Sequence, residues 1–200
     1  MALKFAVNNS LSAVTSLPTA IPTGSMTLLQ TQTASSSATI DFTSNINSTY
    51  DSYVFKFINI HLANNTPFSF QGSTDGGSSY GVTITSTNFF SRHNEADSIT
   101  GLSYSSANDL AQSTSFQRLA TDQGTNNDEN MSGYLQIYNP SSNTFVKHFI
   151  ARTQSAQASS FSMERYVAGY FNTTSTIDAI QFKAESGNID SGDIKLYGIS

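Results

Sequence analysis

From Ala38 to the end of the chain, large apolar residues alternate with polar ones at a spacing of two, which is the repeat of a β-strand. The run ATIDFT places Ile40 and Phe42 on one face, and the pattern returns in GYLQIYN, TFVKHFIAR, MERYVAGYF, IDAIQFKA and DIKLYGI. Segments rich in turn residues separate these runs, so neighbouring strands are expected to pair antiparallel. The alternation therefore predicts an all-β fold.

The longest of these runs, YVFKFINIHL, is apolar on both faces. Its large residues are Tyr53, Phe55 and Phe57 on one face, and Val54, Ile58, Ile60 and Leu62 on the other. A strand carries such a pattern where neither of its sides meets water. We expect this run to be a central strand that is buried on both sides for part of its length.

A glycine-rich segment, STDGGSSYG, lies between an alternating run that contains Phe68 and Phe70 and a second run, VTIT. A phosphate-binding loop would lead into a helix whose N–H groups face the anion, but the residues after Gly77 alternate as a strand does. Asp75 and Gly76, with Gly77, supply the positive φ angles of a tight turn. The segment is predicted to be a hairpin turn rather than a ligand-binding loop.

The middle of the chain, from about Thr85 to Met131, is its least regular part. The segments SRHNEADSITG and ATDQGTNNDEN are too polar and irregular for strands, so we expect loops there, with a short strand from Ile99 to Tyr104. Between them, DLAQSTSFQRL has apolar residues that share a helical face only loosely. This run could form a helix of two or three turns.

Composition bounds the class of protein. Two hundred residues with 38% hydrophobic content fit one domain, because β-sandwiches often reach about 200–250 residues without dividing. The net charge of −5 and pI near 4.9 repel a phosphate backbone, so nucleic acid is not expected as a partner. The chain has no cysteine for disulfides or thiolate metal sites. No run is apolar enough for a membrane span or a signal-peptide core, so neither is expected.

Catalytic and metal-binding patterns are absent from the sequence. His61, His93 and His148 show no metal-ligand spacing, and no G-x-S-x-G motif or distinctive carboxylate pair occurs. The segment from Asp122 to Asn130 has enough oxygen ligands for calcium but lacks the residue order of a calcium-binding loop, so we expect a solvated loop. We therefore expect a protein that is not an enzyme and that holds no cofactor.

The first 36 residues differ from the rest of the chain. Pro18, Pro22 and the lack of a sustained period predict an extended N-terminal arm, residues 1–36, that stays out of the sheet, with a β-sandwich domain over residues 37–200. The arm is too apolar for a free tail, so we expect it to dock on a partner. The side chains expected to bind the partner are Phe5, Val7, Leu11, Val14, Leu17 and Ile21.

The alternating runs also predict a core. Its expected members are Ile40, Phe42, Phe55, Phe57, Ile58, Ile60, Val82, Ile84, Leu135, Ile137, Val146, Ile150, Ile180, Phe182 and Leu196. The chain has 14 Phe and 9 Tyr, which is more than one core of this size needs, and this excess favours self-association.

A group of small virion-associated proteins of tailed bacteriophages that infect aquatic bacteria resembles this chain in six segments: TASSSATIDFTS, FKFINIH, STDGGSSY, DLAQSTSFQ, YNPSSNTFVKHFIA and AGYFNTTSTIDAIQFKAESGNIDSGDIKLYGI. The likeness covers nearly the whole chain, and the terminal hairpin ending in IKLYGI is its most specific part. The resemblance implies a jelly-roll β-sandwich, a homotrimer, and a role as a capsid decoration (cement) protein or a head or tail fibre component. It implies localisation in the virion, after assembly in the host cytoplasm, and no catalytic residue.

Two functions therefore stay open at this point. The first is a decoration protein that binds the outer shell of the capsid, through the major capsid protein or another virion protein, by its N-terminal arm and stabilises the shell. The second is a tail or head fibre component that binds host surface glycans through its loops, where sugar rings would stack on aromatic side chains. Phe89, Phe90 and Tyr104 are the aromatic candidates, although burial in the core is the expected place for each. The copy number per particle would distinguish the two functions.

Overall fold

The computed structural model describes residues 26–200 of the chain. Twelve strands form two sheets, and all neighbouring strands within each sheet pair antiparallel. The larger sheet contains, in spatial order, β1 (Thr27–Ser37), β12 (Ile189–Ile199), β3 (Ser52–Leu62), β8 (Met131–Tyr138), β9 (Lys147–Gln157), β10 (Phe161–Phe171), β5 (Ile84–Asn94) and β6 (Thr100–Tyr104). The smaller sheet contains β2 (Ile40–Phe42), β11 (Ala179–Ala184), β4 (Phe68–Ser73) and β7 (Gln117–Ala120). The described residues contain no helix, which confirms the predicted all-β sandwich.

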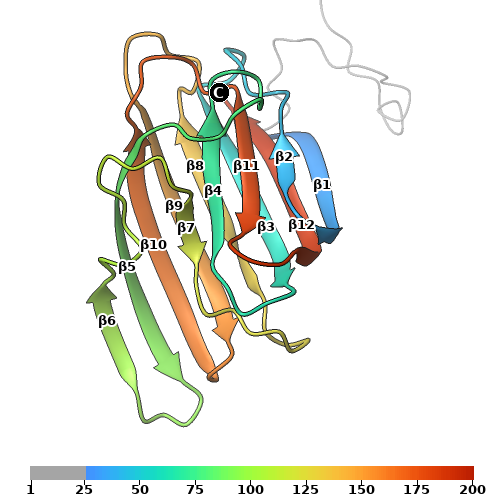
Figure 1. The fold of residues 1–200 in the computed structure, drawn as a ribbon, viewed down its shortest axis with the longest axis vertical. Coiled ribbons are helices and arrows are strands. Elements are labelled where there is room, and N and C mark those ends of the chain that lie inside the picture. The colour runs from blue at the N-terminus through green and yellow to red at the C-terminus, as the bar shows by residue number, and fades with distance from the viewer. Residues whose placement is uncertain (1–25) are drawn as a thin grey trace, which may run out of the picture.

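Eight of the strands follow the order of a jelly roll. The chain alternates between the sheets from β1 to β4 and again over β7, β8, β11 and β12, which places β1, β12, β3 and β8 opposite β2, β11, β4 and β7. The other four strands, β5, β6, β9 and β10, continue the larger sheet beyond β8, and we call them the extension. In Figure 1 the extension lies to the left and reaches below the end of the smaller sheet. The predicted jelly-roll arrangement is therefore confirmed, with two hairpins added to one sheet.

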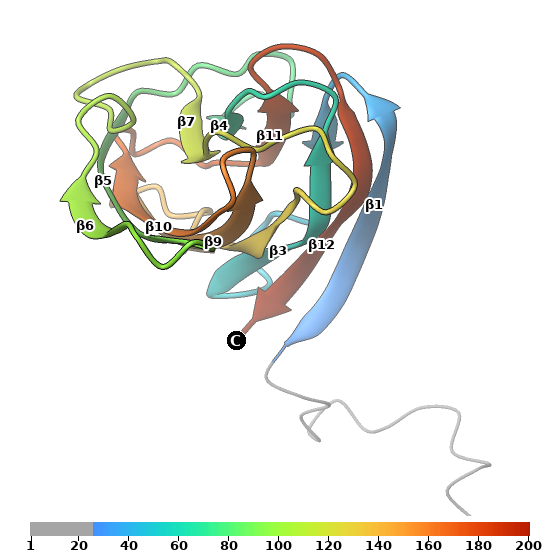
Figure 2. The ribbon, with the colours of Figure 1, turned by 90° about the horizontal axis from the view of Figure 1, so that it is seen from below.

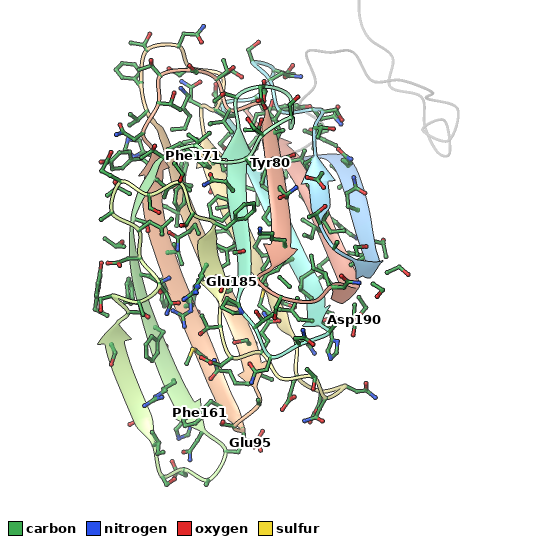
Figure 3. All side chains as sticks on the ribbon, viewed as in Figure 1. Tyr80, Glu95, Phe161, Phe171, Glu185 and Asp190 are labelled. Atoms are coloured by element: carbon green, nitrogen blue, oxygen red, sulfur yellow. The ribbon has the colours of Figure 1, made fainter. Side chains whose placement is uncertain are left out.

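The larger sheet curves around the smaller one, so its outer face is convex (Figure 2). Buried side chains from both sheets fill the space between the two layers. In Figure 3, β10 rises from Phe161, near the lower tip of the extension, to Phe171 at the upper end of the sheet. The lower tip of the extension therefore projects past the part of the molecule that two layers enclose.

Phenylalanine dominates the interior of the jelly roll. Phe182 on β11 is fully buried, and its ring centroid lies 5.2 to 6.4 Å from those of five other rings. These neighbours are Phe42, Phe55, Phe57, Phe68 and Phe70. Edge-to-face and offset contacts between aromatic rings add to the stabilisation from burial of their area.

A polar network occupies part of the interior below the extension. Arg165 on β10 is 3% exposed, and its two terminal nitrogens donate to Asn88 Oδ1 and Thr121 Oγ1, each at 2.7 Å. Its guanidinium lies 5.4 Å from the ring centroid of Phe90, its Nε has no hydrogen-bond partner, and no ion pair to it occurs within residues 26–200. Burial lowers the pKa of Arg165 to about 10, so the side chain stays charged near neutral pH.

Amide side chains connect this network to β7. Gln117 accepts a hydrogen bond from Ser86 Oγ at 2.5 Å and donates to the Asn108 carbonyl at 2.9 Å. Thr153 Oγ1 on β9 donates to the Leu119 carbonyl at 2.6 Å. Directional hydrogen bonds therefore join the extension to the smaller sheet where the Phe cluster does not reach.

The Asp75 segment is a turn, as predicted, but it does not close a hairpin. Because β4 belongs to the smaller sheet and β5 to the larger one, the chain crosses between layers here. Gly76 and Gly77 have φ angles of 71° and 88°. The Asp75 carboxylate accepts hydrogen bonds from Ser73 Oγ and from the Ser79 backbone and hydroxyl, which lower its pKa to about 2. Local turn chemistry was predicted correctly, and the strand partners were not.

Two predictions for the middle of the chain were wrong. No helix forms in DLAQSTSFQRL. Gln71 Nε2 donates hydrogen bonds to the carbonyls of Thr114 and Ser115, at 3.1 and 3.0 Å, and β7 begins at Gln117. SRHNEADSITG is a loop only in part, because β5 continues to Asn94. The predicted strand from Ile99 to Tyr104 is confirmed as β6, and most of ATDQGTNNDEN is irregular, as expected.

Four predicted core residues are not buried. Ile58 and Ile150 are exposed, and Val82 and Val146 are only partly buried, whereas the other eleven are buried. On β9 the inner positions belong to Lys147, Phe149 and Ala151, one residue out of phase with the prediction. Phe149 packs against Phe70 and Phe171, with ring centroids 5.2 and 5.5 Å apart. This aromatic contact fixes the phase of the strand, since a shift by one residue exchanges its two faces.

The phase of β3 changes within the strand. Ser52 to Phe55 are buried on both sides, as predicted, but the register shifts between Phe57 and Ile60, and Asn59 has a φ of 51°. After this bulge Ile60 points inward with Phe57, not to the opposite face. Gly192 on β12 accommodates the bulge, because a Cβ there would lie 2.6 Å from the Asn59 carbonyl oxygen. Bulges re-aim side chains in this way.

The sheet also begins earlier than predicted. Residues 27–36, which we assigned to the arm, belong to β1, and β1 pairs with β12 along most of its length. Pro18 and Pro22, the residues that argued against a strand, lie before this segment. The sequence between the prolines and Ser37 contains no residue that prevents pairing.

Candidate interaction surface

The outer face of the larger sheet is turned away from the smaller sheet, and no other described element covers it (Figure 2). Exposed large apolar side chains gather there, namely Leu28 on β1, Ile58 on β3, Tyr134 and Tyr138 on β8, Ile150 on β9, Phe89 on β5, and Leu102 and Tyr104 on β6. A water-facing antiparallel sheet usually presents polar residues, and contiguous apolar patches mark interaction sites. This face is therefore the candidate functional site.

One row of side chains crosses five neighbouring strands of this face. Cross-strand register places Tyr104, Phe89, Tyr166, Arg152 and Tyr134 side by side. The Phe89 and Tyr166 rings stack at a centroid distance of 4.8 Å and an interplanar angle of 7°. The Arg152 guanidinium lies 5.2 Å from the Tyr166 centroid, on the side of the other neighbouring strand. Both faces of the Tyr166 ring are thus occupied by protein groups.

Glu164 holds the centre of this row in place. Its carboxylate accepts hydrogen bonds from Arg152 Nε and, at 2.8 Å, from the Tyr166 hydroxyl. The hydrogen bond from Arg152 lowers the pKa of Glu164, and the bond to Glu164 raises the pKa of Tyr166. The row is therefore preorganised, with its one ion pair satisfied within the chain.

An apolar groove of about 470 Å³ lies on the same face, at the ends of β8, β9 and β10. His148 lies on the strand between those of Tyr138 and Tyr170, and Ile150 and Ala168 continue the lining along the same strands. The His148 and Tyr170 rings meet edge to face at 6.1 Å. Aromatic side chains thus border an aliphatic surface.

The two threonine hydroxyls that line the groove are engaged within the chain. Thr85 Oγ1 accepts from the backbone and side-chain nitrogens of Gln112 at 3.1 and 2.7 Å, and Thr87 Oγ1 donates to the Ala168 carbonyl at 3.4 Å. Among residues 26–200, no Asp, Glu, Lys or Arg lines it. A side chain at Gly169 would place its Cβ 2.5 Å from the Thr85 carbonyl oxygen, so the position requires glycine. These properties suit an apolar side chain better than a polar ligand.

The site residues predicted from the sequence have different outcomes. The six partner-binding residues of the arm, Phe5, Val7, Leu11, Val14, Leu17 and Ile21, lie outside the described residues. Burial in the core was the wrong expectation for Phe89 and Tyr104, which are exposed on strands rather than in loops. Phe90 is partly buried and faces inward, beside Arg165.

The histidines and the acidic loop show no shared site. His148 lines the groove, His61 contacts the Asn126 carbonyl at 3.2 Å, and His93 contacts Asp97 at 3.0 Å. Over residues 26–200, no group of three or more His, Asp or Glu side chains is placed to hold a metal ion. The segment expected to be solvated is partly buried, since Glu129 turns inward and accepts from the Asn126 backbone N–H at 2.8 Å. No helix in the same range is long and apolar enough to cross a membrane.

Sequence reasoning missed the groove because its residues come from separate strands. A signal was nevertheless present, since β8 to β10 carry large side chains in both phases of the alternation, such as Leu135 with Tyr134 and Val167 with Tyr166. Strands with two apolar faces in a two-layered protein require a further partner for the outer face.

Comparison with known proteins finds no matching family model, no significantly similar curated protein and no significantly similar solved structure.

Proposed function

We propose that this protein is a non-enzymatic structural protein of a bacteriophage virion, a homotrimeric capsid decoration protein that binds the outer shell and stabilises it. The observation that supports a structural role is the uncovered outer face of the larger sheet, with its row of aromatic side chains and its apolar groove. The assignment to a virion rests on the resemblance of six sequence segments to phage virion proteins. Attachment through residues 1–25, with Phe5 and Leu11 among the anchors, stays a prediction.

A protein partner is favoured over a glycan by the geometry of the exposed rings. Sugars stack on free aromatic faces, but the faces of Tyr166 are occupied by Phe89 and Arg152. Sugar hydroxyls also need convergent polar groups, whereas the threonine hydroxyls at the groove are engaged within the chain. An apolar, preorganised face instead resembles the core of a protein interface.

The test is a sedimentation assay with purified capsids that lack the protein. The full-length chain should co-sediment with the capsids and saturate at hundreds of copies per particle. A variant without residues 1–25 keeps β1, which begins at Thr27, and is expected to stay folded but to lose capsid binding. Truncation further into the chain would remove an edge strand and confuse loss of anchoring with loss of stability.

Circular dichroism of both proteins is the control for folding. Equal co-sedimentation of the truncated protein would show that these residues are not the anchor. Saturation at a few dozen copies or fewer would contradict a decoration role and favour a tail or fibre component.

A further inference from the structure

Phe145 is a fixed apolar projection. It lies in the loop between β8 and β9, and 69% of its surface is exposed. Ser142 Oγ accepts hydrogen bonds from the backbone N–H groups of Thr144 and Phe145, at 3.2 and 3.0 Å. The buried Pro140 ties the loop to the sandwich, because its carbonyl accepts from the Ile177 N–H at 2.9 Å. An exposed phenyl ring on a held loop is preorganised for insertion into a partner.

The apolar groove lies beside this projection. Tyr138 directly precedes the loop, and His148 follows Phe145 by three residues, so the groove opens at the foot of the loop. In Figure 1 this loop rises above the upper ends of β8 and β9. Since Phe145 is largely exposed, it does not fill the groove of its own chain. Each copy thus presents an apolar projection and an apolar receptacle next to each other.

We infer that Phe145 of one copy inserts into the groove of a second copy, between Tyr138 and Tyr170 and over Ile150 and Ala168. This inference rests on the proposed homotrimer and assigns its contact. A second copy accounts for both features, because it covers the groove and the projection together.

The contact suits a closed ring. In the proposed trimer the contact is heterologous, because each copy gives its Phe145 to one neighbour and receives the Phe145 of the other. A head-to-tail contact of this kind leaves no surface unmatched when three copies close. The groove offers no charged group and the loop offers none within 142–146, so neither side buries an unpaired charge.

The first experiment uses the absence of cysteine from the chain. Full-length Phe145→Cys and Ala168→Cys variants, with different tags, are co-expressed, so any disulfide between the two tags joins two copies. The matched control pairs Phe145→Cys with Leu102→Cys, which is 71% exposed on the same face but outside the groove. Under mild oxidation, a non-reducing gel should show the disulfide between the two tags for the groove pair and not for the control pair.

The second experiment measures self-association of full-length variants by sedimentation equilibrium. Phe145→Ser and Ala168→Arg should each weaken association at least tenfold, and Leu102→Ser should leave it unchanged. All three positions are exposed in the single chain, so thermal melting of the folded monomer should not change. If the wild type is a trimer, and the Phe145→Ser and Ala168→Arg variants are trimers too, the groove pair should also form no disulfide. This outcome would overturn the assigned contact but not the trimer.

A wild-type monomer at micromolar concentration would overturn both the trimer and the contact. In such a monomer, slow alkylation of the Ala168→Cys thiol would show that residues 1–25 of the same chain cover the groove. Rapid alkylation would show that the groove is uncovered in the monomer, and its partner would then be a different protein. The decoration role is tested separately by capsid binding, so failure of either proposal is recognisable.

Discussion

The jelly roll and the extension differ in what they bury. In the jelly roll, Phe182 lies at the centre of a ring cluster and apolar groups are concentrated inside. In the extension, Arg165 and Asn88 are buried in a polar network, while Phe89 and Ile150 lie outside. The first region can be stable without a partner molecule, because its apolar area is removed from water within the chain. The second also buries Phe149 and Phe171 beside Phe70, but it exposes further apolar surface that only another molecule can cover.

The largest expected effect is in the jelly roll. Phe182→Ala should lower the free energy of unfolding by about 3–5 kcal/mol, because it removes the ring that contacts five others and leaves a cavity. Urea denaturation followed by circular dichroism measures the change. The matched control is Leu102→Ala on the outer face of the extension, which should stay within about 0.5 kcal/mol of the wild type. Similar losses for the two variants would erase the distinction between the regions.

A smaller effect is expected in the polar network. Arg165→Met keeps the approximate length of the side chain and removes a costly buried charge, but it leaves Asn88 Oδ1 and Thr121 Oγ1 without their donor. The net loss should be about 1–3 kcal/mol. Arg165→Lys should cost more than Arg165→Met, since an ammonium keeps the desolvation penalty and cannot span both acceptors as the guanidinium does. Better tolerance of Lys than of Met in the same denaturation assay would show that charge, not hydrogen-bond geometry, is what the network requires.

The smallest effect concerns Lys147, at the boundary of the two regions. Its side chain is fully buried, Nζ donates to the Thr173 carbonyl at 3.2 Å, and burial lowers its pKa below the usual 10.5. Lys147→Met should change stability at pH 7 by about 1 kcal/mol or less, because a lost hydrogen bond and a lost desolvation penalty oppose each other.

The pH dependence of this variant gives a sharper test. Between the lowered pKa of Lys147 and 10.5, the unfolded chain binds more protons than the folded one, so stability of the wild type rises with pH in that window. The difference in unfolding free energy between wild type and Lys147→Met should therefore shift in favour of the wild type from pH 7 towards pH 10. A difference that stays constant over this range would mean that Lys147 does not titrate in the window.

The sequence was sufficient for features that depend on neighbours along the chain. Alternation predicted the strands around Phe55, Leu135 and Phe182, and the glycines after Asp75 predicted the turn, because backbone sterics and local hydrogen bonds determine both. Partner choice was not predictable in this way. Whether the strand after the turn pairs with β4 or with β10 depends on β10 residues that lie 67 to 87 positions further along the chain.

The faces of strands were lost for a similar reason. On β9, alternation alone permits either Ile150 or Phe149 to point inward, and contact with Phe70 from another sheet decides between them. On β3, the bulge at Asn59 depends on Gly192 in the partner strand. The groove could not be predicted for the same reasons, since it exists only once β8, β9 and β10 are aligned in register.

The position of β12 has a consequence for when this protein can fold. The last strand of the chain lies between β1 and β3, and the first strand pairs with nothing else in its sheet. During synthesis, β1 and one edge of β3 must wait, with their N–H and C=O groups unpaired, until β12 has left the ribosome. Closing so long a loop is entropically costly and slow, and unpaired edges in the interval can join other chains. Completion of the larger sheet therefore waits for the synthesis of β12, and loss of β12 would leave β1 and β3, the two earliest strands of that sheet, without their shared partner.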